Sequence, residues 1–215
     1  MEASIKIINI YDNYEFDPKF KTGFGFSCIV KLKNKTILFD TGGDSPTLLS
    51  NMETAGIKPA QIDIVFLSHS HFDHTGGLSG FLEKNPNVTV YKPTSFSKPT
   101  KILENVYSTG ALGTFIKEQS LVIDTNKGLI VITGCAHPGI VSIVITAKEM
   151  LNKKIYLVIG GFHLGGDISA VKDFKELGVE KAAPSHCSGD IAIQAFKQEY
   201  KEDFIFNGVG KVVEV

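Results

Sequence analysis

The stretch Ser68-His69-Ser70-His71-Phe72-Asp73-His74-Thr75-Gly76-Gly77 places three imidazoles and one carboxylate close together. It follows the apolar run 62–67, which has the length of a strand and is rich in β-branched and aromatic side chains. The cluster therefore lies at the C-terminal end of a predicted strand, where open α/β sheets carry their ligand sites. Asp73 could instead cap a following helix, but three histidines so close together have no capping role. The stretch indicates a metal site.

The order of residues in this stretch favours two metal positions. His69 and His71 are two residues apart and project to the same side of an extended chain, so they can hold one ion. The chain then turns at Phe72, and Asp73 and His74 point toward a second position. Imidazole and carboxylate suit borderline or hard divalent ions, of which zinc is the first candidate and iron and manganese are alternatives. The sequence predicts one or two divalent ions.

Composition and charge favour a single domain and argue against nucleic-acid and membrane partners. With 215 residues, 43% of them hydrophobic, and no linker-like segment, we expect a single domain over residues 1–215. A net charge of −1 without a block of basic residues argues against a nucleic-acid partner. Residues 1–10 lack the apolar core of a secretion signal, and no stretch has the length to span a bilayer. We expect a soluble, cytosolic protein with a small-molecule substrate and no membrane partner. The oligomeric state is left open.

The three cysteines, Cys28, Cys135 and Cys187, have unrelated spacings and form no disulfide framework, so reduced thiols are expected. Cys135 and Cys187 each lie close to a candidate histidine. Neither has the paired spacing of a thiolate metal site, and small buried cysteines are common. The sequence therefore favours packing roles for both, with metal binding as the alternative.

The rest of the chain alternates between predicted strands and helices. The segment 92–117 is interrupted by prolines and has few periodic apolar positions, so we interpret it as an excursion from the core. The aromatic side chains of this segment either hold the loop against the rest of the protein or line the entrance to a substrate site. The predicted strands cover 5–10, 24–32, 36–43, 62–67, 88–91, 121–123, 129–133, 155–159, 181–183 and 210–215, and the predicted helices cover 46–55, 78–84, 140–151, 167–177 and 190–200.

The three remaining histidines repeat the position of the first cluster. His137, His163 and His186 each come just after a later predicted strand. A single histidine is more often satisfied by a hydrogen bond, but six at strand ends indicate ligands that face one cleft. Asp40 also ends a predicted strand, where it either caps the next helix or orients a ligating histidine from behind.

A strand followed by HxHxDH, the upstream acid of Phe39-Asp40-Thr41-Gly42 and later histidines at strand ends resemble the metallo-β-lactamase superfamily. The sequences around the later histidines are similar to a subgroup whose named member is the archaeal dihydropterin ribofuranosylaminobenzene phosphate synthase. Many other members of that subgroup are labelled metal-dependent hydrolases. The resemblance covers essentially the whole chain. It implies an α/β (α+β) fold, a four-layer αββα sandwich with the metals at one edge.

The resemblance also implies how the ligands divide between two ions. The implied ligands are His69, His71 and His137 for one ion, and Asp73, His74 and His186 for the other, with Asp40 supporting a ligand from behind.

One departure from the superfamily pattern concerns the strand that ends in Gly160-Gly161. Many members supply a bridging aspartate after this strand, and none is present here. His163 is one candidate replacement, because the glycines let the backbone turn its imidazole toward the site. Asp167 is the other, although its place at a helix start favours a capping role. Asp73 and His163 are the candidate catalytic residues, and we expect the second ion to bind more weakly than the first.

These observations predict a metal-dependent hydrolase in which a dinuclear-type site activates water against a small ester or phosphoester. The first alternative is a synthase or transferase resembling the pterin enzyme, with the metal polarising a phosphorylated co-substrate. The second alternative is a non-catalytic or redox metal-binding module, because related folds in flavodiiron proteins carry iron. That alternative requires a flavin domain, which these residues do not encode.

Overall fold

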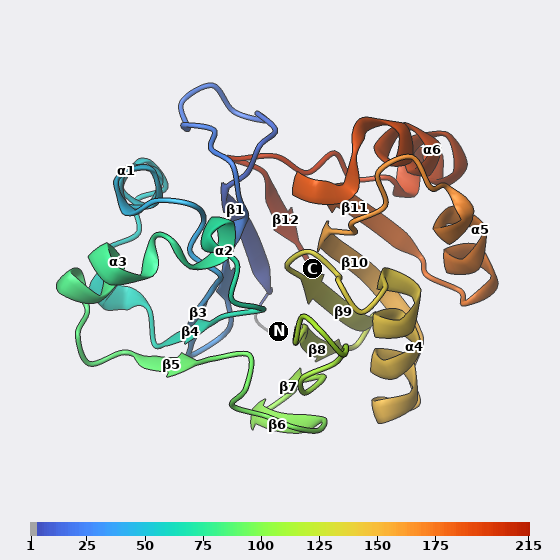
Figure 1. The fold of residues 1–215 in the computed structure, drawn as a ribbon, viewed down its shortest axis with the longest axis horizontal. Coiled ribbons are helices and arrows are strands. Elements are labelled where there is room, and N and C mark those ends of the chain that lie inside the picture. Colours follow the sequence, from blue (N-terminus) through green and yellow to red (C-terminus); the bar gives the residue numbers. More distant parts are fainter. Residues whose placement is uncertain (1–3) are drawn as a thin grey trace. The chain divides into compact units, whose positions relative to one another are not determined.

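The computed structural model describes residues 4–215. The stretch 1–10, in which we expect no secretion signal, therefore begins outside the described residues. The chain forms two compact units. Unit 1 comprises the chain up to Lys92 together with Gly208–Val215, and unit 2 comprises Pro93–Asn207. Each unit contains one six-stranded mixed sheet and its own helices (Figure 1).

Unit 1 is built on a sheet with the strand order β12-β1-β2-β3-β4-β5. Strands β12, β1, β2 and β3 pair antiparallel, whereas β3, β4 and β5 pair parallel. Helices α1 and α3 pack together, and α1 also contacts β1. The elements are β1 (Lys6–Tyr11), β2 (Ser27–Lys31), β3 (Thr36–Phe39), α1 (Ser45–Thr54), a 3₁₀ turn (Pro59–Gln61), β4 (Ile64–Phe66), α2 (Phe72–Thr75), α3 (Leu78–Lys84), β5 (Thr89–Tyr91) and β12 (Val212–Glu214).

Unit 2 is built on a sheet with the strand order β11-β10-β9-β8-β7-β6. Strands β9, β10 and β11 pair parallel, and the other neighbours pair antiparallel. Helices α4, α5 and α6 lie side by side along this sheet (Figure 1). The elements are β6 (Thr100–Leu103), β7 (Val106–Ser108), β8 (Leu121–Thr125), β9 (Gly128–Thr133), α4 (Ile140–Leu151), β10 (Ile155–Gly161), α5 (Ser169–Glu176), β11 (Lys181–Ser185), two 3₁₀ turns (His186–Ser188 and Lys201–Asp203) and α6 (Asp190–Tyr200).

Most predicted elements form close to their predicted bounds, and the segment 92–117 is the main correction. The segment supplies β6 and β7, which extend the second sheet, so its interpretation as an excursion from the core is wrong. Val106 and Ser108 of β7 are fully buried. Asp73 lies inside α2, so its disfavoured alternative role as the cap of a following helix finds no support.

The helix-facing core of each unit explains why these sequences fold as they do. In unit 2 three phenylalanines, Phe162, Phe174 and Phe196, are fully buried, with ring centroids 5.1–5.5 Å apart. In unit 1 the face of α1 that carries Leu48 and Met52 packs against the sheet. Burying one such side chain contributes about 1.5–3 kcal/mol. Among residues 4–215, no helix is both long and apolar enough to cross a membrane.

The parallel strands fix where the predicted site residues lie within each unit. Asp40 follows β3 and His69 follows the neighbouring β4, so both leave the same edge of the first sheet. His137, His163 and His186 follow β9, β10 and β11, which are neighbours in the second sheet. Because parallel strands end at one edge, each unit gathers its own half of the predicted residues.

The start of helix α1 carries a testable contribution to stability. Asp44 accepts hydrogen bonds from the Thr47 N–H and the Tyr11 hydroxyl, each at 2.7 Å. Partial burial raises the pKa of Asp44, but these hydrogen bonds outweigh it and hold the pKa below its usual value. We expect Asp44→Ala to lower the free energy of unfolding by about 1 kcal/mol at neutral pH.

The pH dependence of this contribution has a definite sign. The native pKa of Asp44 is lower than the unfolded one, so the stabilisation is complete above the unfolded pKa and is lost as the pH falls through the native pKa. Urea unfolding of Asp44→Ala and wild type at neutral and acidic pH checks this. If the difference in free energy of unfolding between wild type and Asp44→Ala grew as the pH fell, the sign of this dependence would be contradicted.

Candidate metal centre

In unit 1 the histidine cluster after β4 brings three imidazoles into contact. The ring centroids of His69 and His71 are 4.7 Å apart, and those of His69 and His74 are 4.2 Å apart. His69 and His74 are fully buried, whereas His71 is exposed. The carboxylate of Asp73 lies 3.5 Å from His74 Nε2. The short helix α2 thus folds the predicted residues of this stretch onto one another.

Asp40 forms hydrogen bonds with two residues of this stretch, His74 and Ser68. Its Oδ2 lies 2.7 Å from His74 Nδ1, and its Oδ1 accepts a hydrogen bond from the Ser68 N–H at 2.7 Å. The Ser68 hydroxyl donates to Asp40 Oδ2 at 2.6 Å and lies 2.8 Å from His69 Nδ1. Because an ionised carboxylate only accepts, the proton sits on Nδ1 of His74, and the Ser68 oxygen can accept from Nδ1 of His69. Both histidines then carry a lone pair on Nε2, the tautomer that metal binding requires.

The backbone of Asp40 is unusual as well, since its φ of 53° lies in the left-handed region. A non-glycine residue there costs on the order of 1 kcal/mol and persists where its surroundings hold it. The helix-capping alternative for Asp40 finds no support, because Asp44 caps α1. Asp40 instead contacts a candidate ligand, which is the other interpretation that the sequence left open.

We expect Asp40→Asn to weaken zinc binding by about 10–100-fold, the range typical for loss of a carboxylate that orients a ligating histidine. The amide keeps one acceptor oxygen but no longer favours the Nδ1–H tautomer of His74. Calorimetric titration of the metal-free protein measures the effect. The matched control is Asp63→Asn, because Asp63 bonds Lys35 and Thr36 and no histidine. Equal affinities for both variants would contradict this role of Asp40.

In unit 2 the buried carboxyl group of Glu118 organises the loop after β9. Its Oε1 accepts hydrogen bonds from the N–H groups of Cys135 and Ala136 at 2.9 and 2.8 Å. Its Oε2 accepts from the His137 N–H at 2.9 Å and lies 2.8 Å from His137 Nδ1. Glu118 is 1% exposed. It therefore directs His137 as Asp40 directs His74, leaving Nε2 of His137 for a metal.

The sequence interpretation did not identify Glu118, although one signal could have revealed it. Glu118 lies just before β8, and β8 runs antiparallel to β9. The start of β8 and the end of β9 therefore lie at the same edge of the sheet, which brings Glu118 to the loop that holds His137. Only the strand pairing gives this contact, since the two residues lie far apart in the sequence.

The other two histidines of unit 2 lie in the loops after β10 and β11. The rings of His137 and His163 are 4.8 Å apart, and His163 is exposed. His186 is buried, with its Nε2 3.4 Å from the sulfur of Cys135. A hydrogen bond from the Cys135 thiol, followed by one from His163, outweighs burial and lowers the pKa of Cys187 to about 4.

The two candidates for the missing aspartate lie in different surroundings. Asp167 is fully exposed, and its Oδ1 accepts a hydrogen bond from the Ser169 N–H at 2.8 Å, which holds the pKa of Asp167 below its usual value. Asp167 thus bonds the first residue of α5 from just before the N-cap, Ile168, and the capping role that the sequence favoured stays a prediction. His163 instead faces His137. The assignment of ligands to two ions joins residues of both units and stays a prediction.

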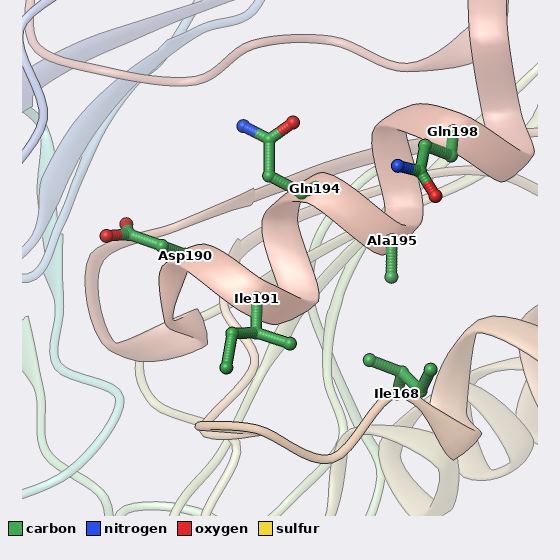
Figure 2. Close-up of a pocket in the computed structure, with 6 residues that line it drawn as sticks. All are labelled: Ile168, Asp190, Ile191, Gln194, Ala195 and Gln198. Atoms are coloured by element: carbon green, nitrogen blue, oxygen red, sulfur yellow. The ribbon is translucent and has the colours of Figure 1, made fainter.

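The residues within each unit fit a divalent metal. Three histidines, His69, His74 and His137, have Nδ1 engaged by a hydroxyl or a buried carboxyl group, which is how proteins orient imidazole toward a metal. Oxygen and nitrogen donors of this kind suit zinc, iron and manganese alike. A separate hollow along α6 contains none of the predicted site residues (Figure 2). It is lined by Ile168, Asp190, Ile191, Gln194, Ala195 and Gln198.

Comparison with known proteins finds relatives that match nearly the whole chain. The chain is 29% identical to the 7,8-dihydropterin-6-methyl-4-(β-D-ribofuranosyl)-aminobenzene-5′-phosphate synthase of Methanocaldococcus jannaschii over 284 residues, covering 98% of this chain and 97% of the relative. A solved metal-dependent hydrolase of the β-lactamase superfamily is 28% identical, with a TM-score of 0.81, covering 98% of this chain and 99% of that one. The metallo-β-lactamase fold protein YhfI of Bacillus subtilis, 14% identical, shares the fold with a TM-score of 0.71, covering 99% of both chains.

Residues 21–150 match the sequence model of the metallo-β-lactamase superfamily. This match covers more than half of the chain and includes the histidine cluster, Asp40, Glu118 and His137. The predicted fold class is confirmed, because the chain has two mixed sheets flanked by helices and the superfamily's fold. The resemblance inferred from HxHxDH and the later histidines is confirmed as well: the chain belongs to the metallo-β-lactamase superfamily.

Proposed function

We propose that this protein is a metal-dependent hydrolase that acts on a small ester or phosphoester. The observation that carries the proposal is the pair of buried carboxyl groups, Asp40 and Glu118, that hold Nδ1 of His74 and His137. Such pairs orient imidazoles toward a catalytic metal. A divalent ion, for which zinc is our first choice, supplies Lewis acidity and lowers the pKa of water when bound.

We assign the remaining roles in the proposed reaction to residues of the chain itself. Asp73 is buried beside His74, and we assign its carboxylate the role of accepting a proton from the attacking water. His163 is exposed and therefore lies on the side of the centre that a substrate can reach, where we assign it a part in holding an ion. The buried histidines His69 and His74 hold the metal and keep their orientation through Ser68 and Asp40. The substrate is a small molecule, and the working compartment is the cytosol.

A second candidate function is synthesis of the pterin product made by the M. jannaschii relative. The 29% identity over nearly the whole of both chains favours it. However, that alignment spans 284 residues and this chain has 215, so the synthase contains segments that have no counterpart here. The solved hydrolase matches this chain over almost its full length. We therefore place hydrolysis first.

The test is an assay of the zinc-, manganese- and iron-loaded protein against ester, phosphodiester and lactam panels, with synthesis of the pterin product measured in parallel. The hydrolase proposal predicts turnover of a small ester or phosphoester that stops when a chelator removes the metal. Pterin synthesis without any hydrolysis would favour the second candidate. Inactivity on every substrate, beside a working control enzyme, would argue against both.

A further inference from the structure

Two cysteines and a histidine of unit 2 meet at the ends of β9, β10 and β11. The sulfur atoms of Cys135 and Cys187 and a ring nitrogen of His163 all lie within 4.8 Å of one another. We call these three residues the thiol cluster. Cys135 is buried, Cys187 is partly buried and His163 is exposed, so the cluster is open on one side. The spacing of these residues along the chain does not indicate this arrangement.

The backbone is shaped to admit the sulfur of Cys187. A Cβ on Gly161 would lie 2.7 Å from that sulfur and 2.3 Å from the Gly134 carbonyl oxygen, so only glycine fits there. The glycine pair at the end of β10 thus leaves a space that a thiol fills. The sulfur of Cys187 therefore lies against the end of β10.

Strained backbone surrounds the cluster. Ala136, His163 and His186 have φ values of 64°, 48° and 51°, in the left-handed region that non-glycine residues avoid. Each is a member of the thiol cluster or adjoins one of its cysteines. Left-handed non-glycine residues cost about 1–3 kcal/mol each and gather at functional sites. Packing roles for the two cysteines do not account for three such residues.

The donor spacings suit a metal. The two sulfur atoms and the ring nitrogen of His163 lie within 4.8 Å of one another. On a tetrahedral zinc ion, with bonds of about 2.3 Å to sulfur and 2.0–2.1 Å to nitrogen, a sulfur donor and a nitrogen donor lie about 3.5 Å apart, which is within that range. Two thiolates with one imidazole are a known donor set of catalytic zinc, which keeps a fourth position open. Sulfur donors also select zinc over manganese and magnesium.

We propose that Cys135, Cys187 and His163 form a thiolate-containing site for a borderline or soft metal ion such as zinc or cadmium. The site lies wholly within unit 2 and goes beyond the proposed reaction, because it concerns which metal the chain holds and through which atoms. The sequence favoured packing roles for the cysteines, and the geometry favours the alternative.

The test replaces zinc with cobalt(II) in the full chain under reducing conditions. Thiolate-to-cobalt charge transfer absorbs in the near ultraviolet, so wild type is expected to show this band. Cys187→Ser and Cys135→Ser are expected to weaken it, and the double variant to lose it. The matched control is Cys28→Ala, because Cys28 lies in β2 of unit 1. The band is expected to persist in that variant.

A measurement on the wild type alone covers the case in which a variant fails to fold. Zinc is expected to protect Cys187 from alkylation by iodoacetamide, and a chelator to remove the protection, as read by peptide mass spectrometry. Absence of the cobalt band in wild type, or alkylation of Cys187 that zinc does not change, would overturn the proposal. Neither result depends on turnover, so failure of the hydrolase proposal is detected separately.

Discussion

Replacement of Glu118 by alanine is expected to lower the free energy of unfolding by about 3–5 kcal/mol, because two buried N–H groups and the partly buried N–H and ring of His137 lose their acceptor together. For a chain of this size, that corresponds to a fall in melting temperature of roughly 6–20 °C. Metal affinity is expected to fall as well, since nothing then fixes the orientation of His137. Calorimetric unfolding and zinc titration measure the two effects.

Two further variants separate these effects. Glu118→Gln keeps one acceptor oxygen, so we expect a smaller loss of stability but a loss of zinc affinity of about 10–100-fold. The control is Glu149→Ala, because Glu149 is an exposed glutamate of α4 in the same unit. A Glu118→Ala protein as stable as this control would show that the loop does not depend on the carboxyl group.

Replacement of His69 or His71 by alanine is expected to remove the metal and abolish activity while the fold persists. Each loses a proposed ligand, so the loss of affinity should exceed the roughly 10–100-fold typical of removing a supporting residue. The hydrophobic cluster of unit 1 does not include these side chains, so the fold should persist in both variants. Metal-free His71→Ala should unfold close to the metal-free wild type, and His69→Ala somewhat below it, because His69 is fully buried whereas His71 is exposed. The loaded wild type gains the linked binding energy, about 2.7 kcal/mol at a zinc concentration 100 times its Kd.

Ser70 provides the control, because it is exposed and lies between the two histidines. Ser70→Ala is expected to keep metal, activity and stability. Zinc content after dialysis, turnover and thermal unfolding are measured on all four proteins. If the histidine variants were insoluble even with zinc present, the cluster would have a structural role instead.

The fold was predictable where local pattern decides structure. Helices α3, α4 and α6 have the predicted bounds, because their apolar spacing and end residues agree with the packing that forms. Strands β6 and β7 were missed, because prolines and sparse apolar residues obscure a short hairpin at a sheet edge. There the pairing of β7 with β8, and not local preference, decides the structure.

The candidate site was predictable where its residues are close together in the sequence. The first cluster is continuous in sequence, so its metal-binding character is visible in HxHxDH. Asp40 was a candidate because an acid follows a strand. The contact of Glu118 with His137 could have been predicted only through the antiparallel pairing of β8 with β9. The meeting of Cys135 with Cys187 depends on the parallel pairing of β9, β10 and β11, which the spacing of the two cysteines does not reveal.

The pairing of β1 with β12 has a consequence for the order in which the chain can fold during synthesis. Unit 2 is one continuous segment, whereas the first sheet receives β12 only after all of unit 2 has left the ribosome. Until then β1 is an edge strand with unpaired backbone groups, of the kind that pairs with other chains. Nascent chains that stall after unit 2 are therefore expected to be the aggregation-prone form of this protein.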